Sequence, residues 1–403
     1  MTDSAPISSS EVLRDARDFS VVLGGPLYQL LRRTHLTNDT MLLLQRRIVA
    51  ISLFAWAPLL VLSAISGQLA GDGVSVPFLL DLETHIRFLV VVPLLLAAEL
   101  VVHKRLLPIA RALLERHLIR DEDLPRFDAA LRTASRWRNS LLAEVLMIAS
   151  VYLIGVLFVW RRYTAPGADT WYETSPGHNG QLSPAGIWFV FVSLPLFQFL
   201  LLRWYFRLFI WTRFLWQVSR LHLNLIPTHP DNLGGLGLLG NTVYAFTVLL
   251  VAHGAMVAAQ IAGRVLLLGA TLPQFKVEIA TVLVLLLLVV FGPMFLFAPQ
   301  LSRTKRAGLL EYGTFAESYT RQFDRKWLRG GVPANESVLG SADIQSLADL
   351  ASSFDVVRSM RLAPVTRSAV IQLACAVLVP MLPLLLTMMP LEALLKKLLN
   401  LVL

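Results

Sequence analysis

The chain alternates between long apolar segments and shorter polar connections. Seven apolar segments have about the 20 residues that a helix needs to cross the hydrocarbon layer of a bilayer. They are residues 48–66, 86–102, 141–160, 187–202, 242–262, 279–298 and 368–389. The pattern predicts an all-α protein, a polytopic transmembrane helical bundle with seven spans.

The composition supports this prediction. Hydrophobic residues make up 55% of the 403 residues and charged residues only 16%, which is more apolar than is usual for a soluble domain. The formal net charge of +9 would indicate nucleic-acid binding in a soluble protein. In a membrane protein, the positions of the basic residues carry more information than their sum.

The Lys and Arg residues are distributed unequally between the two sides of the predicted bundle. Most of the 36 lie before the first span or in the connections between spans two and three, four and five, and six and seven. The seven exceptions are Arg87, Arg161, Arg162, Arg264, Lys276, Lys396 and Lys397. Because cytoplasmic loops retain Lys and Arg, we expect a cytoplasmic N-terminus in the bacterial inner membrane. We also expect these basic residues to contact anionic lipid headgroups and not nucleic acid.

The same pattern divides the chain into three parts. Residues 1–47 form an N-terminal cytoplasmic segment that is compatible with an interfacial helix. Residues 48–389 form the membrane domain, which includes a cytoplasmic helical hairpin at 103–140 and a cytoplasmic helical insertion at 302–366. Residues 390–403 are typical of an amphipathic helix that lies on the outer surface or packs in a homo-oligomer.

The insertion at 302–366 contains two stripes of apolar residues with helical spacing. The stripes are Tyr312, Phe315, Tyr319, Phe323 and Trp327, followed by Ile344, Leu347, Leu350, Phe354 and Val357. We expect them to pack on the hairpin or on each other. The alternative is a groove that binds a cytoplasmic partner.

The most distinctive motif precedes the fifth span, on the predicted inner side. It contains Thr228, His229, Asp231, Asn232, Gly234, Gly235 and Gly237. Glycines and a capping carboxylate are typical of a tight turn, but free amides near a helix start also bind anions. The spacing matches neither a Walker loop nor a dinucleotide fingerprint. The motif therefore predicts a structural turn or a ligand or gating site at the inner mouth of a route.

This motif resembles a string found in an uncharacterised family of bacterial multi-pass membrane proteins. The resemblance extends loosely to the Phe-Ala-Pro-Gln segment at 297–300, which ends the sixth span. It implies a multi-pass membrane fold and carries no activity with it.

The fifth span has a polar stripe. Thr242, His253, Gln260 and Arg264 share one face of the predicted helix. A polar face is costly in contact with lipid, so we expect this span in the centre of the bundle. His253 is there either to bond a neighbouring helix or to line an ion or proton route.

Three polar residues in other spans complete the candidate pathway. Gln198 lies in the fourth span, and Glu99 and Glu144 lie toward the inner ends of the second and third. Carboxyl groups in the hydrocarbon region mark candidate sites unless they are paired. The structural alternative is that both glutamates pair with Arg138, Lys104 or arginines of the inner loops.

No catalytic, metal or cofactor signature is present in the sequence, and we predict no metal site and no cofactor. The leading functional hypothesis is a channel-like or transporter-like bundle with a polar route along the fifth span. The second is a non-catalytic scaffold or complex subunit that recruits a partner through its cytoplasmic loops. The third is a lipid-modifying enzyme that uses His229 and Asp231.

Overall fold

The computed structural model describes residues 20–22, 24, 41–70, 74–156, 170–173, 182–331, 337 and 340–388. Within these ranges the protein is helical, with isolated bridges in place of strands. The α-helices are α3 (Met41–Ile65), α4 (Leu82–Ile86), α5 (Val92–Glu115), α6 (Leu124–Arg138), α7 (Leu141–Ser150), α9 (Pro184–Trp188), α10 (Leu194–Val218), α11 (Gly237–Gly240), α12 (Thr247–Leu268), α13 (Lys276–Phe291), α14 (Ala298–Phe323), α15 (Ala342–Ser359) and α16 (Arg367–Leu378).

Short turns of other helical types extend or join these helices. The π-helical turns are η2 (Arg87–Val91), η4 (Val151–Val156), η5 (Phe189–Ser193) and η9 (Asp324–Leu328). The 3-10 turns are η1 (Phe78–Leu80), η3 (Asp121–Asp123), η6 (Asn241–Phe246), η7 (Leu272–Phe275), η8 (Gly292–Phe297) and η10 (Val379–Thr387).

Six continuous helical segments in the described part of the chain are long and apolar enough to span a membrane. They are Leu44–Ile65, Leu82–Glu115, Pro184–Val218, Gly237–Leu268, Leu272–Leu328 and Arg367–Thr387. Asp121–Arg138 and Leu141–Gly155 form a pair bent by 46° that adds a seventh if it counts as one span. The protein is therefore a multi-pass membrane protein, as the apolar pattern predicts.

The predicted limits of the spans were too short in several cases. The second predicted span, 86–102, lies in a helical segment that runs from Leu82 to Glu115, and the sixth, 279–298, lies in one that runs to Leu328. The apolar tract marks only the part of a helix that lipid covers, while the backbone hydrogen bonds continue into polar sequence. Of the third predicted span, residues 157–160 lie outside the described residues, as do most of 1–47 and all of 390–403.

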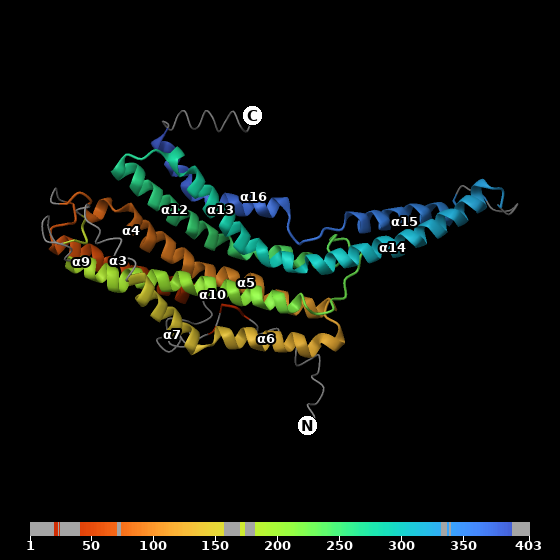
Figure 1. Cartoon of the computed structure of the whole chain (residues 1–403), viewed down its shortest axis with the longest axis horizontal. Helices are drawn as coiled ribbons and strands as arrows, with labels where there is room; N and C mark the ends of the chain where they lie inside the picture. The colour runs from red at the N-terminus through yellow and green to blue at the C-terminus, as the bar shows by residue number, and fades with distance from the viewer. Residues whose placement is uncertain are drawn as a thin grey trace, which may run out of the picture.

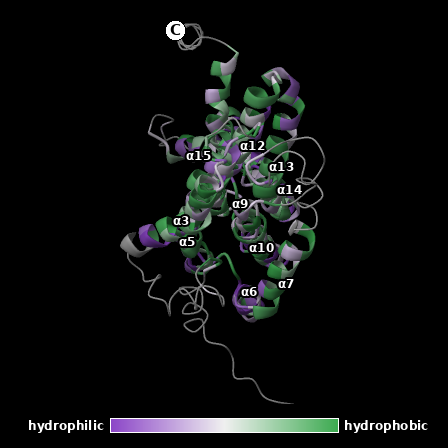
Figure 2. Ribbon diagram, turned by 90° about the vertical axis from the view of Figure 1, so that its left-hand side faces the viewer, coloured by the Kyte–Doolittle hydropathy of each residue, from purple (hydrophilic) through white to green (hydrophobic). Residues whose placement is uncertain are grey.

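Large apolar side chains cover the outside of the bundle. On α3 and α13, for example, Phe54, Val61, Val284 and Leu288 are each more than half exposed. Figure 2 shows hydrophobic residues along α3, α5, α10 and α13, and hydrophilic residues gathered on α6. Such a surface is unfavourable in water and suits a hydrocarbon environment.

Helix α12 lies at the centre of the bundle. The most apolar window of its span is 61% buried, a larger share than in any other candidate span. Close packing is possible because a Cβ added to Gly254 would overlap the backbone carbonyl of Val377 on α16. Small residues on this helix thus allow backbone-to-backbone contact, as the sequence predicts for the fifth span.

Two π-helical turns precede prolines at the same spacing. The turn η2 ends two residues before Pro93, and η5 ends two residues before Pro195. Proline lacks an N–H and clashes with the carbonyl of the preceding turn, and a wider π turn relieves both problems. The two turns lie in neighbouring helices, where the rings of Phe88 and Phe189 are in edge contact with centroids 6.4 Å apart.

Helices α14 and α15 form a hairpin that projects from one end of the bundle, opposite the end at which α4 and α9 lie (Figure 1). We call these the hairpin end and the pocket end. Hydrogen bonds to Asp343, on α15, hold the two helices together. Its carboxylate accepts them from Lys326 Nζ at 2.8 Å and from Trp327 Nε1 at 3.1 Å, both on η9 at the end of α14. The hydroxyl of Tyr319 donates to the backbone carbonyl of Asp343. The two stripes predicted for the insertion at 302–366 therefore lie on helices that pack side by side.

Candidate functional site

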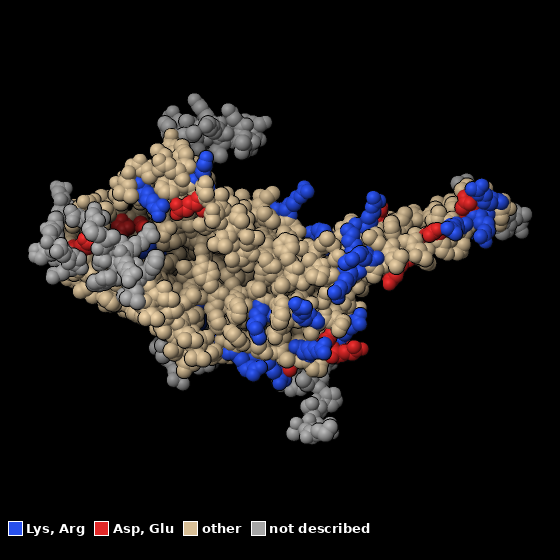
Figure 3. Space-filling view, in the orientation of Figure 1, with Lys and Arg blue, Asp and Glu red and all other residues tan. Residues whose placement is uncertain are grey.

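A pocket of about 600 Å³ lies at the pocket end, between helices that are distant in the sequence. We call it the polar pocket. It is lined by Val76, Asp81, Leu82, Glu83, Thr84, Arg87, Thr170, Trp171, Tyr172, Phe189, Leu194, Phe197, Gln198, Met256, Gln260, Gly263, Arg264, Leu267, Leu268 and Glu278. Figure 3 shows a hollow at this end of the molecule with both acidic and basic side chains at its border. The pocket thus combines buried charge with an opening to the surface.

Arg87 is the most buried charged residue of the polar pocket. Only 3% of Arg87 is exposed, and its guanidinium pairs with Glu83, one helical turn earlier. The guanidinium carbon also lies 5.9 Å from the ring centroid of Phe189 and 5.6 Å from that of Phe197. The ion pair and the two aromatic faces together compensate for the removal of this charge from water.

Asp81 fixes the start of α4 at the edge of the pocket. Its carboxylate accepts hydrogen bonds from the Thr84 amide at 3.1 Å, the Thr84 hydroxyl at 2.6 Å and the Trp171 indole N–H at 2.9 Å. The first two bonds cap the helix, and the third ties a distant connecting segment to it. Trp171 is fully buried, so this contact is part of the frame of the pocket.

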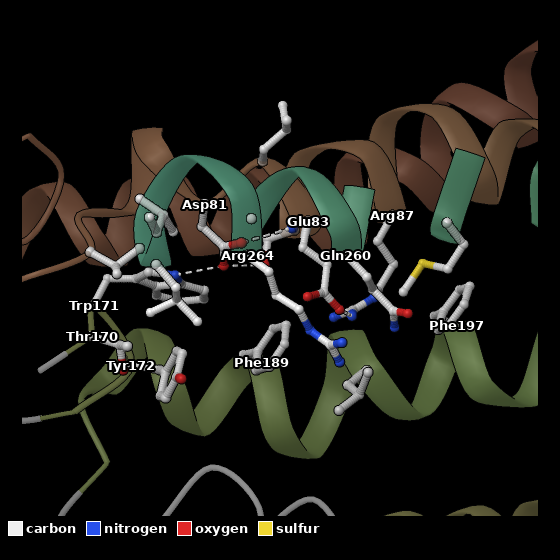
Figure 4. Close-up of a pocket in the computed structure, with 18 of the residues that line it drawn as sticks. Asp81, Glu83, Arg87, Thr170, Trp171, Tyr172, Phe189, Phe197, Gln260 and Arg264 are labelled. Atoms are coloured by element: carbon white, nitrogen blue, oxygen red, sulfur yellow. Dashed lines mark hydrogen bonds and ion pairs between the residues drawn. The ribbon is translucent and has the colours of Figure 1, made fainter. Parts of the chain in front are cut away.

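Arg264 and Glu278 lie at the opening. Their side chains form an ion pair of 3.3 Å between α12 and α13, and each is 40% exposed. The guanidinium carbon of Arg264 is also 5.6 Å from the ring centroid of Phe275. Figure 4 shows Arg264, Gln260, Glu83 and Arg87 directed toward one another from two sides of the pocket.

Two carboxamides, one hydroxyl and the buried Nε of Arg87 have no hydrogen-bond partner in the pocket among the described residues. The carboxamides belong to Gln198 and Gln260. The hydroxyl belongs to Thr170, a residue that is only 6% exposed. Gln198 also lies against Gly155, where an added Cβ would overlap its amide oxygen. These groups give the pocket donors and acceptors that the protein itself does not use.

The structure brings together three of the six residues predicted for a pathway. Gln198, Gln260 and Arg264 line the polar pocket, although Gln198 comes from a different helix. His253, from the same predicted stripe, points elsewhere: its Nε2 lies 2.8 Å from the Tyr205 hydroxyl, and its Nδ1 lies 2.8 Å from the Leu249 carbonyl oxygen. Both ring nitrogens have partners, which favours the structural interpretation of His253. Thr242 is likewise buried and bonded to the Leu239 carbonyl.

Glu99 and Glu144 belong to a separate cluster of buried ion pairs. Glu99 on α5 pairs with Arg47 on α3 and with Arg207 and Arg203 on α10, the last two at 2.8 and 3.6 Å. Glu144 on α7 lies 3.9 Å from Arg203. Glu99 is about 18 Å further along its helix than Arg87. The cluster therefore joins four helices outside the polar pocket. Pairing with basic residues was the structural alternative, but the partners in these ion pairs are Arg47, Arg203 and Arg207, none of which it named.

The predicted inner-mouth loop is organised around the carboxylate of Asp231. This group accepts hydrogen bonds from the amides of Leu233 at 2.7 Å, Gly235 at 3.2 Å and Gly237 at 2.8 Å, and His229 Nδ1 lies 2.9 Å away. Burial raises the pKa of the Asp231 carboxyl, but the hydrogen bonds from Gly237, Leu233 and Gly235 outweigh it, so the pKa falls below its ordinary value of 3.8. The chain's own carboxylate thus takes the place of a bound anion.

The rest of this loop connects distant parts of the hairpin end. Asn232 has a positive φ of 55°, accepts a hydrogen bond from the Arg361 amide at 2.8 Å and bonds the Ser359 hydroxyl through its side chain. The hydroxyls of Thr228 and Tyr312 lie 3.4 Å apart. Gly234 adopts φ 64° and is buried, so a side chain at this position would be strained. This geometry favours the structural turn among the alternatives open for the motif.

Five polar residues of the pocket were not predicted from the sequence: Asp81, Glu83, Arg87, Thr170 and Glu278. Arg87 had a signal, because it is a basic residue at the start of an apolar tract on the side that has few basic residues. Thr170 had none, since it comes from a connecting segment whose position depends on the fold. Among the described residues no group of three or more His, Cys, Asp or Glu side chains is arranged to hold a metal ion.

Comparison with protein-family models, characterised proteins and solved structures gives no match. The geometry of the polar pocket is therefore the basis for assigning a function.

Proposed function

We propose that this protein is a transporter-like bundle of the bacterial inner membrane and that the polar pocket is its solute site. The observation that carries the proposal is the convergence of Gln198, Gln260 and Arg264, from two helices, on one cavity of about 600 Å³. Polar residues inside a membrane bundle are costly and mark substrate pathways. The volume is within the range of pockets that bind small molecules.

The arginine distribution supports an opening toward the outside of the cell. Figure 3 places most Lys and Arg side chains on that face over the half of the molecule nearer the α14–α15 hairpin. Because basic residues are retained in the cytoplasm, the hairpin end is the cytoplasmic end in this proposal. The polar pocket then takes solute from the external side.

A transporter fits the geometry better than an open channel. Between the pocket and the hairpin end, the helices that carry Arg87 and Gln198 continue with buried apolar residues. The Trp204 indole N–H donates a hydrogen bond to the Leu95 carbonyl there, at 2.9 Å. Neither His253 nor Glu99 lines the pocket. A route through this bundle therefore needs a change of conformation, and the π turns η2 and η5 beside the pocket are natural sites for it.

The test is uptake into liposomes that contain the purified full chain. The probes are labelled D-glucose, glycine and inorganic phosphate, which represent uncharged, zwitterionic and anionic solutes. We expect at least one probe to enter faster than into empty liposomes, and Gln260→Leu to slow that uptake at least tenfold. Gln345→Leu, on the polar surface of α15, is the matched control and leaves uptake unchanged. Uptake equal to that of empty liposomes for all three probes would refute the proposal.

The exposed hairpin favours a second role, that of a subunit that recruits a cytoplasmic partner. Leu310 and Leu328 are each 72% exposed and Phe315 is 60% exposed, although this part of the chain is otherwise polar. Exposed apolar residues on a projecting helix pair are typical of interaction surfaces. Capture of a partner that is lost on Phe315→Ser, with solute uptake intact, would support this role.

A further inference from the structure

We propose that the polar pocket selects small uncharged molecules rich in hydroxyl groups, such as polyols and sugars. This inference depends on the proposed function, since it names the class of solute for the same pocket. It is based on a comparison of the polar groups in the pocket that have hydrogen-bond or ion-pair partners with those that have none.

The ionic groups of the pocket are compensated by the protein itself. Arg87 pairs with Glu83, and Arg264 pairs with Glu278 at 3.3 Å. Asp81 accepts three hydrogen bonds, two from Thr84 and one from Trp171. The Arg264–Glu278 pair lies at the opening, where water screens it. A charged solute that broke the Arg87–Glu83 pair would leave an unpaired charge at the buried end of the pocket, which is costly. The pocket therefore discriminates against ions of either sign.

The groups that remain without partners are three neutral side chains and the buried Nε–H of Arg87, whose charge is already paired with Glu83. The carboxamides of Gln198 and Gln260 each offer donors and an acceptor, and the Thr170 hydroxyl offers both. A hydroxyl-rich solute matches this set because each of its hydroxyl groups also both donates and accepts. A site built to hydrogen-bond hydroxyl groups rejects analogues that lack them, since its own polar groups are then left unpaired.

The wall of the pocket provides a complementary apolar surface. Tyr172 and Phe189 stack with ring planes 13° apart and centroids separated by 6.2 Å, and Phe197 lines the same cavity. Aromatic rings present a large apolar surface whose faces carry a partial negative charge. The C–H faces of a sugar or polyol suit such a wall, while the hydroxyl groups reach the carboxamides.

Equilibrium binding to the purified full chain in detergent tests this selectivity. The probes are glycerol, sorbitol, D-glucose and maltose for the uncharged class, and glycine, choline and inorganic phosphate for the charged classes. We expect saturable binding of at least one uncharged probe, with every charged probe at least tenfold weaker. Failure of all four uncharged probes to bind saturably, or tighter binding of any charged probe, overturns the inference.

Variants distinguish the loss of hydrogen bonds to the carboxamides from a general disturbance of the fold. Gln198→Leu and Gln260→Leu remove hydrogen-bonding groups but no charge, and we expect each to weaken binding of the uncharged probe at least tenfold. Gln260→Glu keeps the size of the side chain, so equal weakening in this variant excludes a packing artefact. Gln345→Leu serves again as the control. Unchanged binding in the Gln260 variants, at unchanged thermal stability, also overturns the inference.

The results distinguish this inference from the function on which it depends. Tight binding of an uncharged probe without uptake by liposomes refutes transport and preserves the selectivity. Uptake of glycine or phosphate that is lost in Gln260→Leu preserves transport and refutes the selectivity.

Discussion

The Nη2 atom of Arg207 on α10 lies 2.8 Å from the Oε1 atom of Glu99 on α5, in the interior of the apolar bundle. The other carboxylate oxygen of Glu99 pairs with Arg47 on α3. One glutamate therefore compensates two arginines directly and lies 3.6 Å from a third, Arg203. All four side chains are less than a tenth exposed. One carboxylate thus pairs with arginines of two neighbouring helices, α3 and α10, while Glu144 on α7 lies 3.9 Å from Arg203.

Glu99→Gln should be strongly destabilising. The amide keeps the shape of the side chain but removes the charge, so three buried guanidinium groups lose their main counter-charge. Breaking a buried ion pair by removal of one partner typically costs about 3–5 kcal/mol. Unfolding of the purified protein in detergent, followed by heating or by titration with a denaturing detergent, measures the loss.

Glu115→Gln is the matched control for this variant. Glu115 forms an ion pair with Arg111 on the same helix, but its side chain is 45% exposed. Water screens such a pair, and its loss should cost less than about 0.5 kcal/mol. A similar stability for Glu99→Gln and Glu115→Gln would contradict the central role of the buried cluster.

Gly254→Ala should separate α12 from α16. The added Cβ would overlap the backbone carbonyl of Val377, which cannot move aside as a flexible side chain could. Overpacking of this kind typically costs about 1–3 kcal/mol. The measurement is again the unfolding midpoint of the purified protein in detergent.

Gly263→Ala on the same helix separates this steric effect from a general effect of the substitution. No heavy atom lies within 4 Å of a Cβ added there, and alanine favours a helix over glycine by about 1 kcal/mol. This variant should be as stable as the wild type or more so. Equal destabilisation by the two alanines would show that close helix contact at Gly254 is not the cause.

How much of this molecule the sequence predicts depends on the range of the interactions. The spans can be predicted from local apolar tracts, and the central position of α12 from its polar and small residues. Each of these patterns lies within a single helix. Gln198, Gln260 and Arg264 were singled out because a polar residue in a span requires a reason. In contrast, Thr170 is held at the pocket by contacts between distant segments, among them its bridge to Val76 and the Trp171–Asp81 bond. No local pattern encodes those contacts.

The same distinction explains why the predicted pathway divides into two places. Spacing along one helix groups His253 with Gln260, but it says nothing of the neighbouring helix that supplies Tyr205 to the imidazole. Likewise, Glu99 has its arginine partners on α3 and α10, far away in the sequence. The residue types indicate which side chains could pair with His253 or Glu99. Which of these pairs forms depends on how the helices pack.

Asp231→Asn should destabilise the loop in a pH-dependent way. The amide NH₂ would face backbone N–H donors, so at least one of the amides of Leu233, Gly235 and Gly237 loses its acceptor, at a cost of about 1–3 kcal/mol. Because folding lowers the pKa of the Asp231 carboxyl below 3.8, its stabilising contribution is complete above about pH 5. The contribution is lost as the pH falls through the folded-state pKa.

Unfolding midpoints at pH 7, 5, 4 and 3 for wild type and Asp231→Asn measure this effect. The difference between the two proteins should be largest at pH 7 and should narrow below pH 4. His229 and Arg361, which contact Asp231 through its carboxylate and its carbonyl, remain in both proteins. A difference that stays constant from pH 7 to pH 3 would show that the ionised carboxylate does not hold the loop.

The orientation of the bundle yields a prediction that cysteine labelling can decide. In a Cys375→Ser background, Thr271→Cys places a thiol at the pocket end, and Glu317→Cys places one on α14 at the hairpin end. Both positions are exposed. Because most basic residues belong to segments on the hairpin side, a membrane-impermeant maleimide added to intact cells should label Thr271→Cys only. Both variants should react after the cells are permeabilised. Labelling of Glu317→Cys in intact cells would place the hairpin outside and turn the polar pocket toward the cytoplasm.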